Sequence, residues 1–578
     1  MAESNRKYQN LLQGSIILAA ATALVKIFGM IYRIPLNNML GELGAGYYST
    51  AYDLYLPIYS LAMAGLPVAI SRMVAESVAS KRFADTRKLL KLSQRAFTVT
   101  GITGTVLMLV ATYFYLFNDA FRSFANIDEK PDSVYAIVLI SFSILFCCMM
   151  SSLRGYYEGL RNMIPTAVSQ VIEAAGKLLL GLVLVWGTKY VCINVYGMSN
   201  DESLPFAAGA AVLGVTLGTA AGALYLFITH KVKGDGITEE ELLLSPPAQS
   251  SRSLIKSLAV IALPIVVGSM VRDVASLVDL TTVKGRIDGL AQTNPNLVYD
   301  YYSVVGMTSE ELNDIPNYLY GIYKGFAYSI YNLVPTLTSV IGVSAIPALS
   351  TAWAVRDAGG TKQNSESIIR LTSIIAFPAG FGIACLSGPV LDLLYSSRPN
   401  GVIIATPVLT ILGIGAIFAG IAVPLTNMLQ AIGKQNVPVI NMAVGVALKI
   451  VVNYVLVGIE SVNIVGAAVG TTVCYAYIFA ANLICYIKYS KAKISLISVI
   501  FKPAFSGAVC GLAAYLANRG LNSLIGAGKA NTALCIIIAA VIYIICLGVT
   551  KTFTENDIKM LPKGEKLVKL LAKLHWIG

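Results

Sequence analysis

Apolar segments long enough to cross a membrane follow one another along the whole chain of 578 residues. A membrane-spanning helix needs about 20 mostly apolar residues. Only 13% of the residues are charged, against roughly 25% in a soluble domain. The sequence therefore predicts an all-α integral membrane protein without a soluble domain. The fourteen predicted spans are Leu11–Met39, Gly46–Val78, Leu89–Phe117, Ser133–Gly159, Ile164–Trp186, Phe206–His230, Leu254–Val283, Asn317–Val355, Ile368–Tyr395, Val402–Ile432, Val437–Gly458, Ile464–Ile487, Leu496–Ala517 and Asn531–Thr550.

Lysine and arginine are concentrated in alternate loops between these spans. The loops after even-numbered spans hold clusters such as Lys81, Arg82, Arg87, Lys88 and Lys91. The opposite loops, such as GELGAG and GMSNDES, are poor in them. An excess of Lys and Arg marks the cytoplasmic side of a membrane. We therefore predict a multi-pass protein of the cell (plasma) membrane with both termini in the cytoplasm.

One stretch of the sequence occurs twice, because Gly46–Ser71 is echoed by Gly325–Ser350 with polar residues and prolines matched as well as apolar ones. Two copies of a half-molecule in a membrane often form a transport pathway between them. We therefore predict a transporter with two pseudo-symmetric lobes of six helices each. The predicted parts are an N-lobe at residues 1–231, a cytoplasmic linker at 232–253, a C-lobe at 254–490, two further helices at 491–552 and a cytoplasmic amphipathic tail at 553–578, whose Lys563–Trp576 resembles an interfacial helix.

Several cations lie inside the apolar spans, where charge is costly and usually faces a cavity or a partner. Phosphate groups attract cations, and arginine offers them a bidentate fork. Arg154 and Lys324 lie nearer the ends of spans, so we expect their side chains to snorkel to the interface. The candidates for binding an anionic substrate in a central cavity are Lys26, Arg33, Arg272, Lys177 and Lys449.

Acids inside the spans are candidates for pairing with these cations or for binding a coupling cation. Glu173 and Lys177 are four residues apart with the acid first, so an ion pair within the helix is the alternative to a cavity role. Gly214, Gly218 and Gly222 form a stripe of small residues, which predicts close helix packing. The candidate acids are Asp53, Glu173, Asp273 and Asp279.

Enzyme signatures are missing from the sequence. Gly526–Ala530 lacks the first glycine and the Ser or Thr of a phosphate-binding loop, and there is no HExxH. The nine cysteines show no CxxC or metal-ligand spacing. We predict no catalytic residue, no metal site, no cofactor and no nucleic-acid partner. Two alternatives remain: a cation-coupled exporter of cationic drugs, and a membrane glycosyltransferase that uses loop acids such as Asp300 or Glu310.

The segment Val25–Glu76, with its YDL triplet and GLPVAISRMVAE, resembles the MOP flippase superfamily. Within it the chain is similar to the polysaccharide-biosynthesis branch, which holds the MurJ-type lipid II flippases, in particular their Gram-positive form, and the stage V sporulation protein B type. The resemblance implies two lobes around a central cavity, two C-terminal helices that line a groove for a lipid tail, and alternating access in a bacterial membrane. It implies a lipid-linked glycan precursor as substrate: lipid II first, or another undecaprenyl-linked glycan of capsule, teichoic or sporulation type.

The resemblance also implies roles for particular residues. Lys26, in VKIFG, lies at the place of a cation on which the family's first span depends, and Arg33 falls within one residue of a second. Family members carry arginines in spans two and eight, where this chain has Tyr59-Ser60 and Tyr331-Asn332. We predict that Arg272 substitutes for them. We further expect a monomer in contact with membrane lipids and the cell-wall synthesis machinery, driven by a coupling cation (Na⁺ or H⁺) or the membrane potential.

Overall fold

The computed structural model describes residues 11–63, 65–117, 132–302, 306–526 and 528–554. All regular elements in this part of the chain are helices, which confirms the all-α prediction. Eleven of these described segments are long and apolar enough to cross a membrane, so the number of fourteen spans stays a prediction. The predicted tail helix Lys563–Trp576 lies outside the described residues.

The chain forms two compact units, Met1–Thr281 and Thr282–Gly578, and each is described by itself. The boundary falls inside η1 (Leu280–Lys284), a π-helical turn that continues the helix before it. The helix before it is α9 (Ser251–Asp279), which the sequence assigns to the C-lobe but which packs on helices of unit 1. The duplication in the sequence predicts a linker between the two lobes at residues 232–253, and this division stays a prediction.

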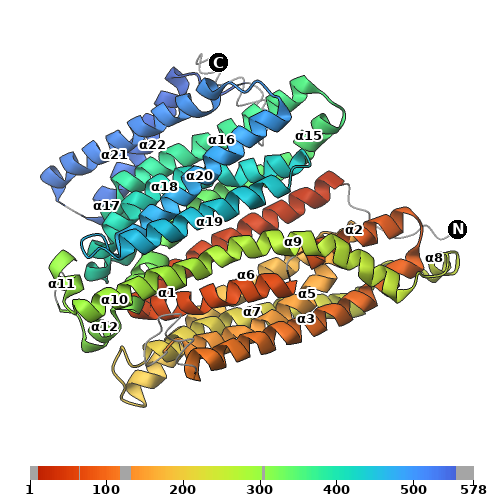
Figure 1. Cartoon of the computed structure of the whole chain (residues 1–578), viewed down its shortest axis with the longest axis horizontal. Helices are drawn as coiled ribbons and strands as arrows, with labels where there is room; N and C mark the ends of the chain where they lie inside the picture. The colour runs from red at the N-terminus through yellow and green to blue at the C-terminus, as the bar shows by residue number, and fades with distance from the viewer. Residues whose placement is uncertain (1–10, 64, 118–131, 303–305, 527, 555–578) are drawn as a thin grey trace. The chain divides into compact units, whose positions relative to one another are not determined.

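Unit 1 is a bundle in which the long helix α7 contacts both α5 and α6, while α3 contacts α5 (Figure 1). Helix α1 contacts α5, α6 and α9. The helices are α1 (Leu11–Met63), α2 (Leu66–Ala79), α3 (Phe83–Phe117), α5 (Val134–Gly159), α6 (Ile164–Asn194), α7 (Leu204–Lys233), the short α8 (Glu239–Leu243) and α9 (Ser251–Asp279).

The first two predicted spans are separated where the sequence places their connection, because α1 consists of two helices joined at Gly41, the first residue of GELGAG, whose φ of 68° and ψ of −167° are not helical. The predicted second span has a further break at Gly65, whose φ of 81° is favourable only for glycine. A methyl group on Gly65 would also lie 2.6 Å from the carbonyl oxygen of Ala262 in α9. The break therefore lets α9 pass close to the start of α2.

The predicted linker is folded against unit 1. The Arg87 guanidinium of α3 donates to Glu239 at 3.1 Å and to the carbonyl oxygen of Ile237 at 3.2 Å. The Tyr156 hydroxyl of α5 donates to Asp235 at 2.9 Å. Several independent contacts thus hold the linker on the ends of α3 and α5, and a chain tethered in this way loses much of the freedom of a flexible connection.

Unit 2 is built around α18, which contacts α15, α16 and α20. The predicted span Asn317–Val355 is interrupted in this structure, because a π-helical stretch and a break at Asn332 divide it. Such π-helical stretches are rare and frequently occur at functional sites. The elements are α10 (Gly285–Thr293), α11 (Leu297–Tyr302), α12 (Ser309–Asn313), α13 (Ile315–Gly321), η2 (Ile322–Ala327), α14 (Tyr328–Tyr331), α15 (Leu333–Ala354), α16 (Ala358–Cys385), α17 (Ser387–Tyr395), α18 (Pro399–Ala431), α19 (Asn436–Val457), α20 (Ile464–Ser490), η3 (Ile497–Phe501), α21 (Lys502–Ile525) and α22 (Lys529–Val549).

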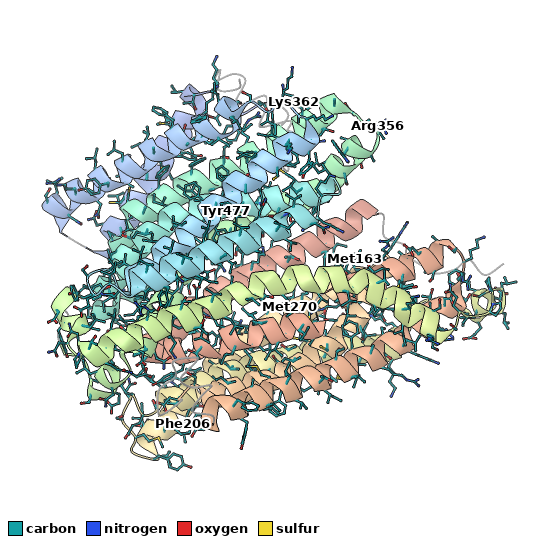
Figure 2. The ribbon with its side chains drawn as sticks, in the orientation of Figure 1. Met163, Phe206, Met270, Arg356, Lys362 and Tyr477 are labelled. Atoms are coloured by element: carbon teal, nitrogen blue, oxygen red, sulfur yellow. The ribbon has the colours of Figure 1, made fainter. Side chains whose placement is uncertain are left out.

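Five helix ends carry a cation with left-handed backbone, a position where glycine is usual. A positive charge there is favoured by the helix macrodipole. Each of the five follows an even-numbered predicted span, which agrees with cytoplasmic loops at these ends; the orientation itself stays a prediction. Figure 2 labels Arg356, one of these residues, at the end of α15. They are Lys81, Arg161, Arg356, Lys491 and Lys551.

The segment between Lys284 and Asn317 contains three short helices, of which α10 contacts the end of α19 and α11 contacts the turn between α19 and α20. The Arg286 guanidinium lies 4.4 Å from the ring of Tyr454 and donates to its carbonyl oxygen at 3.1 Å. The Tyr302 hydroxyl donates to Asn463 at 2.5 Å. Burial raises the pKa of this hydroxyl, so it stays a donor throughout the neutral range.

Replacing Gly458 by alanine should release this docking. The new methyl group would collide with the guanidinium of Arg286, which would have to leave the ring of Tyr454. We expect a local loss of about 1 kcal/mol, the size of one exposed cation–π contact, and faster proteolysis at residues 285–313. Gly289→Ala is the control, because a methyl group there meets nothing within 4 Å. Equal proteolysis of both variants would contradict the docking.

Candidate functional site

Four tyrosines form a row along one face of α1, spaced three or four residues apart. The ring centroids of Tyr48 and Tyr52 are 4.8 Å apart, those of Tyr52 and Tyr55 6.1 Å, and those of Tyr55 and Tyr59 5.2 Å. Residues at this spacing share a helix face. The row therefore gives the interior of unit 1 a continuous surface of aromatic rings and hydroxyl groups.

Two cations lie against this row. The Lys177 ammonium of α6 donates to the Tyr52 hydroxyl at 3.2 Å and lies 5.2 Å from the ring centroid of Tyr32 and 5.3 Å from that of Tyr52. The Arg33 guanidinium lies 5.0 Å from the ring centroid of Tyr48. Aromatic faces attract cations at these distances. We call Tyr32, Arg33, Tyr48, Tyr52 and Lys177 the cation–tyrosine site.

Glycine packing between α6 and α7 places Lys177. A methyl group on Gly218 of α7 would lie 2.7 Å from the amide nitrogen of Lys177 and 2.8 Å from the carbonyl oxygen of Glu173. A methyl group on Gly181 would likewise lie 2.8 Å from the ring of Tyr32. Small residues allow helix backbones to approach this closely. The predicted packing role of the glycine stripe is therefore confirmed.

Next to this site, Glu173 pairs with a different cation from the one that its spacing predicts. Its carboxylate accepts from Arg154 of α5 at 2.9 Å, and Arg154 also donates to Ser169 at 2.9 Å. The predicted pair with Lys177 is therefore wrong, because Lys177 contacts tyrosines instead. The predicted snorkelling of Arg154 is also wrong, since only 14% of its side chain is exposed. The available signal was Glu173 itself, an acid inside an apolar span that needs a partner.

Helix α9 contributes an acid that contacts α1 at the residue after the last tyrosine of the row. The Ser60 hydroxyl, at the position where the resemblance implies an arginine, donates to the carboxylate of Asp273. The side chain of Arg272 lies outside the described residues, so its predicted substitution for that arginine stays a prediction. Asp53 in α1 and Asp279 at the end of α9 are both buried. The structure thus places Asp273 against Ser60, the residue that follows Tyr59 of the row.

The remaining predicted cations are placed as follows. Lys26 lies on α1 seven residues before Arg33, and both are half-buried. Lys449 belongs to α19 of unit 2 and is 5% exposed. A common binding role for these cations stays a prediction.

Unit 2 holds a lysine among tyrosines that the sequence analysis missed. The Lys324 ammonium, in η2, lies 5.8 Å from the ring centroids of Tyr320 and Tyr323 and 4.9 Å from that of Tyr328. Only 6% of Lys324 is exposed, so its predicted snorkelling is wrong. The tyrosines at positions 320, 323 and 328 were the available signal, because a run of rings around a cation in an apolar segment favours a cation–π cage.

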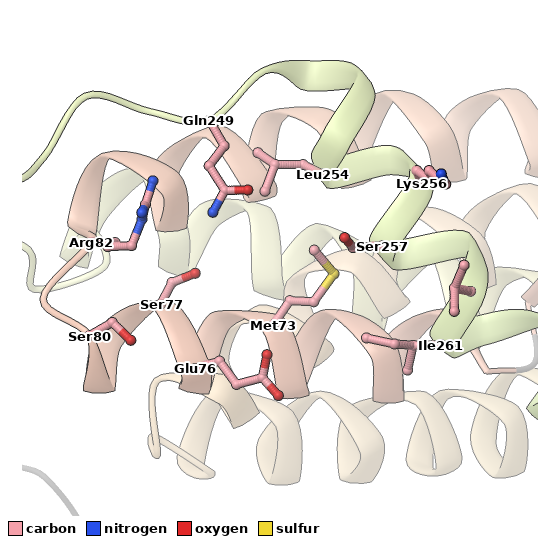
Figure 3. A pocket seen from close by; sticks show the side chains of 11 residues that line it. Met73, Glu76, Ser77, Ser80, Arg82, Gln249, Leu254, Lys256, Ser257 and Ile261 are labelled. Carbon is pink, nitrogen blue, oxygen red and sulfur yellow. The ribbon is translucent and has the colours of Figure 1, made fainter.

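A cavity of about 500 Å³ lies between α2 and α9 in unit 1 (Figure 3). Its lining includes Glu76 and Arg82, but Glu76 already pairs with Arg72 at 2.8 Å and Arg82 with Asp85 at 2.6 Å. Serines and Met73 form much of the remaining wall. Lys256 also lines this cavity, but it is a single exposed cation. The cation–tyrosine site holds two cations against a row of rings inside the bundle and is the better candidate for an anion.

Two family models match the chain. The model described as polysaccharide biosynthesis protein matches residues 11–353, and the model described as lipid II flippase MurJ matches residues 326–546. The first covers more than half of the chain and contains the cation–tyrosine site.

Individual relatives agree with these models. The chain is 25% identical to stage V sporulation protein B of Bacillus subtilis (strain 168), over 97% of this chain and 99% of that protein. It is 23% identical to lipid II flippase MurJ of the same organism, over 80% of each. Among solved structures, an inward closed conformation of lipid II flippase MurJ matches with a TM-score of 0.61 at 15% identity, covering 92% of this chain and 98% of that one. This likeness shows the fold.

Proposed function

The chain belongs to the polysaccharide biosynthesis protein family, a branch of the MOP superfamily, and from this premise we propose that it is a flippase for a lipid-linked precursor. The substrate that we infer is the undecaprenyl-pyrophosphate-linked peptidoglycan precursor, lipid II. It moves from the inner to the outer leaflet by alternating access. Family and fold favour a transporter over an enzyme.

The cation–tyrosine site is the observation that carries this proposal. A pyrophosphate that crosses the bilayer needs positive charge to replace its water. Lys177 and Arg33 supply that charge from the interior of a helix bundle, with tyrosine hydroxyl groups beside them as further donors. The tyrosine rings lie against both cations and help to hold them in place.

The proposal also assigns roles to the acids of unit 1. Glu173 lies one helical turn from Lys177, but it accepts from Arg154 and so leaves Lys177 available to an anion. We propose that Asp53 and Asp279, both buried, bind a coupling cation or respond to the membrane potential. The lipid tail, which needs no polar partner, stays in the bilayer.

A flippase for another undecaprenyl-linked glycan is the second candidate. The relative of stage V sporulation type covers 97% of this chain, against 80% for lipid II flippase MurJ. A precursor of sporulation or capsule type carries the same pyrophosphate and lipid, so it would meet the same cations. The two candidates differ only in the sugar and peptide head group.

Replacing both Lys26 and Arg33 by alanine should stop outward movement of the precursor. Loss of a charge-assisted hydrogen bond costs about 1.5–3 kcal/mol, so we expect a fall of roughly 10- to 100-fold or more. Cells depleted of their own copy would carry the variant, and mass spectrometry would identify the precursor that accumulates. An externally added degrading enzyme would measure the fraction in the outer leaflet.

Arg95→Ala is the matched control, because Arg95 is an exposed cation on α3 of the same unit. It should move precursor like the unaltered protein. Normal movement by the double variant, at equal amounts in the membrane, would refute the role of these cations. Accumulation of a sporulation or capsule precursor in place of lipid II would favour the second candidate.

A further inference from the structure

A cavity of about 900 Å³ opens at one end of unit 2, and all of its lining residues belong to that unit. Two chain segments that are distant in sequence build it: the turn from the end of α15 to the start of α16, and the turn that follows α20. Figure 2 labels Arg356 and Lys362 at the first of these turns. Because the two segments meet only in the folded unit, the cavity is a feature of the tertiary structure.

Four cations line this cavity, namely Arg356, Lys362, Lys491 and Lys493, and its lining contains no acid. Lys362 lies 3.9 Å from Glu366, a carboxylate that also accepts from the backbone nitrogen of Ser495. In the described part of the chain, the other three cations form no ion pair. Like charges around one concavity repel each other, and an anion between them would relieve that repulsion.

The cationic side chains, rather than the N-terminus of α16, attract an anion to this cavity. Helix α16 begins at this cavity, but the carboxylate of Asp357 already accepts from the amide of Gly360 at 2.9 Å and caps the helix. This carboxylate also offsets part of the positive field. All four lysine or arginine side chains of the lining are exposed, and they can close on a phosphate group as point charges or as a fork.

The rim of the cavity is amphipathic. Trp353 and Ala354 line it on one side and Ala492 on the other, next to the exposed Val355. Tryptophan beside lysines at the end of a spanning helix is typical of the membrane interface. The cavity also follows predicted spans eight and twelve, whose loops the distribution of Lys and Arg predicts to be cytoplasmic.

We propose that this cavity binds the phosphate head group of an anionic phospholipid of the surrounding leaflet. Basic pockets between helices at the cytoplasmic side are suited to such head groups. The phosphate of a soluble metabolite shares the same chemistry, but such a molecule has no acyl chain that would contact the tryptophan and the apolar rim. The site does not depend on the function proposed above, since it belongs to unit 2 alone and lies outside the cation–tyrosine site.

Lipid retention by the purified full-length chain tests the proposal. Native mass spectrometry in detergent would titrate phosphatidylglycerol, and phosphatidylcholine with the same acyl chains would serve as the neutral lipid. Because each surface lysine contributes about 1 kcal/mol to anionic lipid binding, the pair Lys491→Gln and Lys493→Gln should weaken phosphatidylglycerol binding roughly 30-fold. The pair Arg356→Gln and Lys362→Gln should have a similar effect.

The matched control removes two exposed lysines elsewhere, as Lys231→Gln with Lys233→Gln at the end of α7. It should retain phosphatidylglycerol like the unaltered chain. An equal loss in this control would overturn the site, because it would show a non-specific effect of charge. Inorganic pyrophosphate gives the other arm: if it binds in a way that the cavity variants abolish while lipid retention is unchanged, the ligand is a soluble phosphate and the proposal is wrong.

Discussion

Replacing Gly218 by alanine should reduce precursor transport at least 10-fold and lower the free energy of unfolding. The added methyl group would lie 2.7 Å from the backbone nitrogen of Lys177 and 2.8 Å from the carbonyl oxygen of Glu173, and backbone atoms cannot rotate away as a side chain can. Overpacking of this kind typically costs about 1–3 kcal/mol. The helices must separate, so Lys177 leaves Tyr52 and Glu173 leaves Arg154. Thermal unfolding of the purified chain and precursor movement in depleted cells measure the two effects.

Gly187→Ala on α6 is the control for this experiment. A methyl group there meets nothing within 4 Å, and alanine favours a helix over glycine by about 1 kcal/mol. This variant should be as stable as the unaltered protein or slightly more stable, with normal transport. If Gly218→Ala behaved in the same way, the close contact between α6 and α7 would not position Lys177.

Lys177→Met should abolish most transport while it leaves the bundle folded. Methionine keeps most of the unbranched apolar stem of the side chain and its packing near Tyr32 and Tyr52, but it removes the charge that we assign to the pyrophosphate. Losing a charge-assisted bond to the substrate costs about 1.5–3 kcal/mol, and we therefore expect roughly a 10- to 100-fold fall in outward movement. The thermal unfolding temperature should change little.

A second substitution, Lys177→Arg, tests whether transport needs only the positive charge or also the compact shape of the ammonium group. Lys177→Arg keeps the positive charge, but its planar fork replaces a compact ammonium between two rings, so we expect partial transport. Lys231→Met, at the exposed end of α7, controls for a general loss of charge and should transport normally. Full transport by Lys177→Met at normal membrane levels would remove Lys177 from the mechanism, and a large fall in stability would assign it a structural role instead.

The sequence predicted the helices well where one apolar segment forms one helix. Predicted span four, Ser133–Gly159, is α5 (Val134–Gly159), and span twelve begins at Ile464 as α20 does. It failed where a helix is interrupted without a change in hydropathy. The break at Gly65 and the π-helical turn at residues 322–327 lie within apolar stretches, so composition carried no signal of them.

The candidate site likewise has features that the sequence predicts and features that it does not. Periodicity and burial cost indicate that Lys177 and Glu173 need partners, but helix spacing proposes each as the partner of the other. The structure pairs Glu173 with Arg154 and places Lys177 on Tyr52. Helix rotation about its axis decides which neighbours a side chain meets, and that rotation is set by the packing of several helices together.

The sequence by itself determined that the chain is an all-helical membrane protein built on a duplication and belongs to its family, because hydropathy, repeats and local motifs are properties of neighbouring residues. Only the tertiary structure decided that Arg33 and Lys177 share a row of tyrosines, and that cations from two distant segments surround one cavity in unit 2. These groupings depend on contacts between residues far apart in the chain. Such contacts follow from close packing, which no single segment specifies.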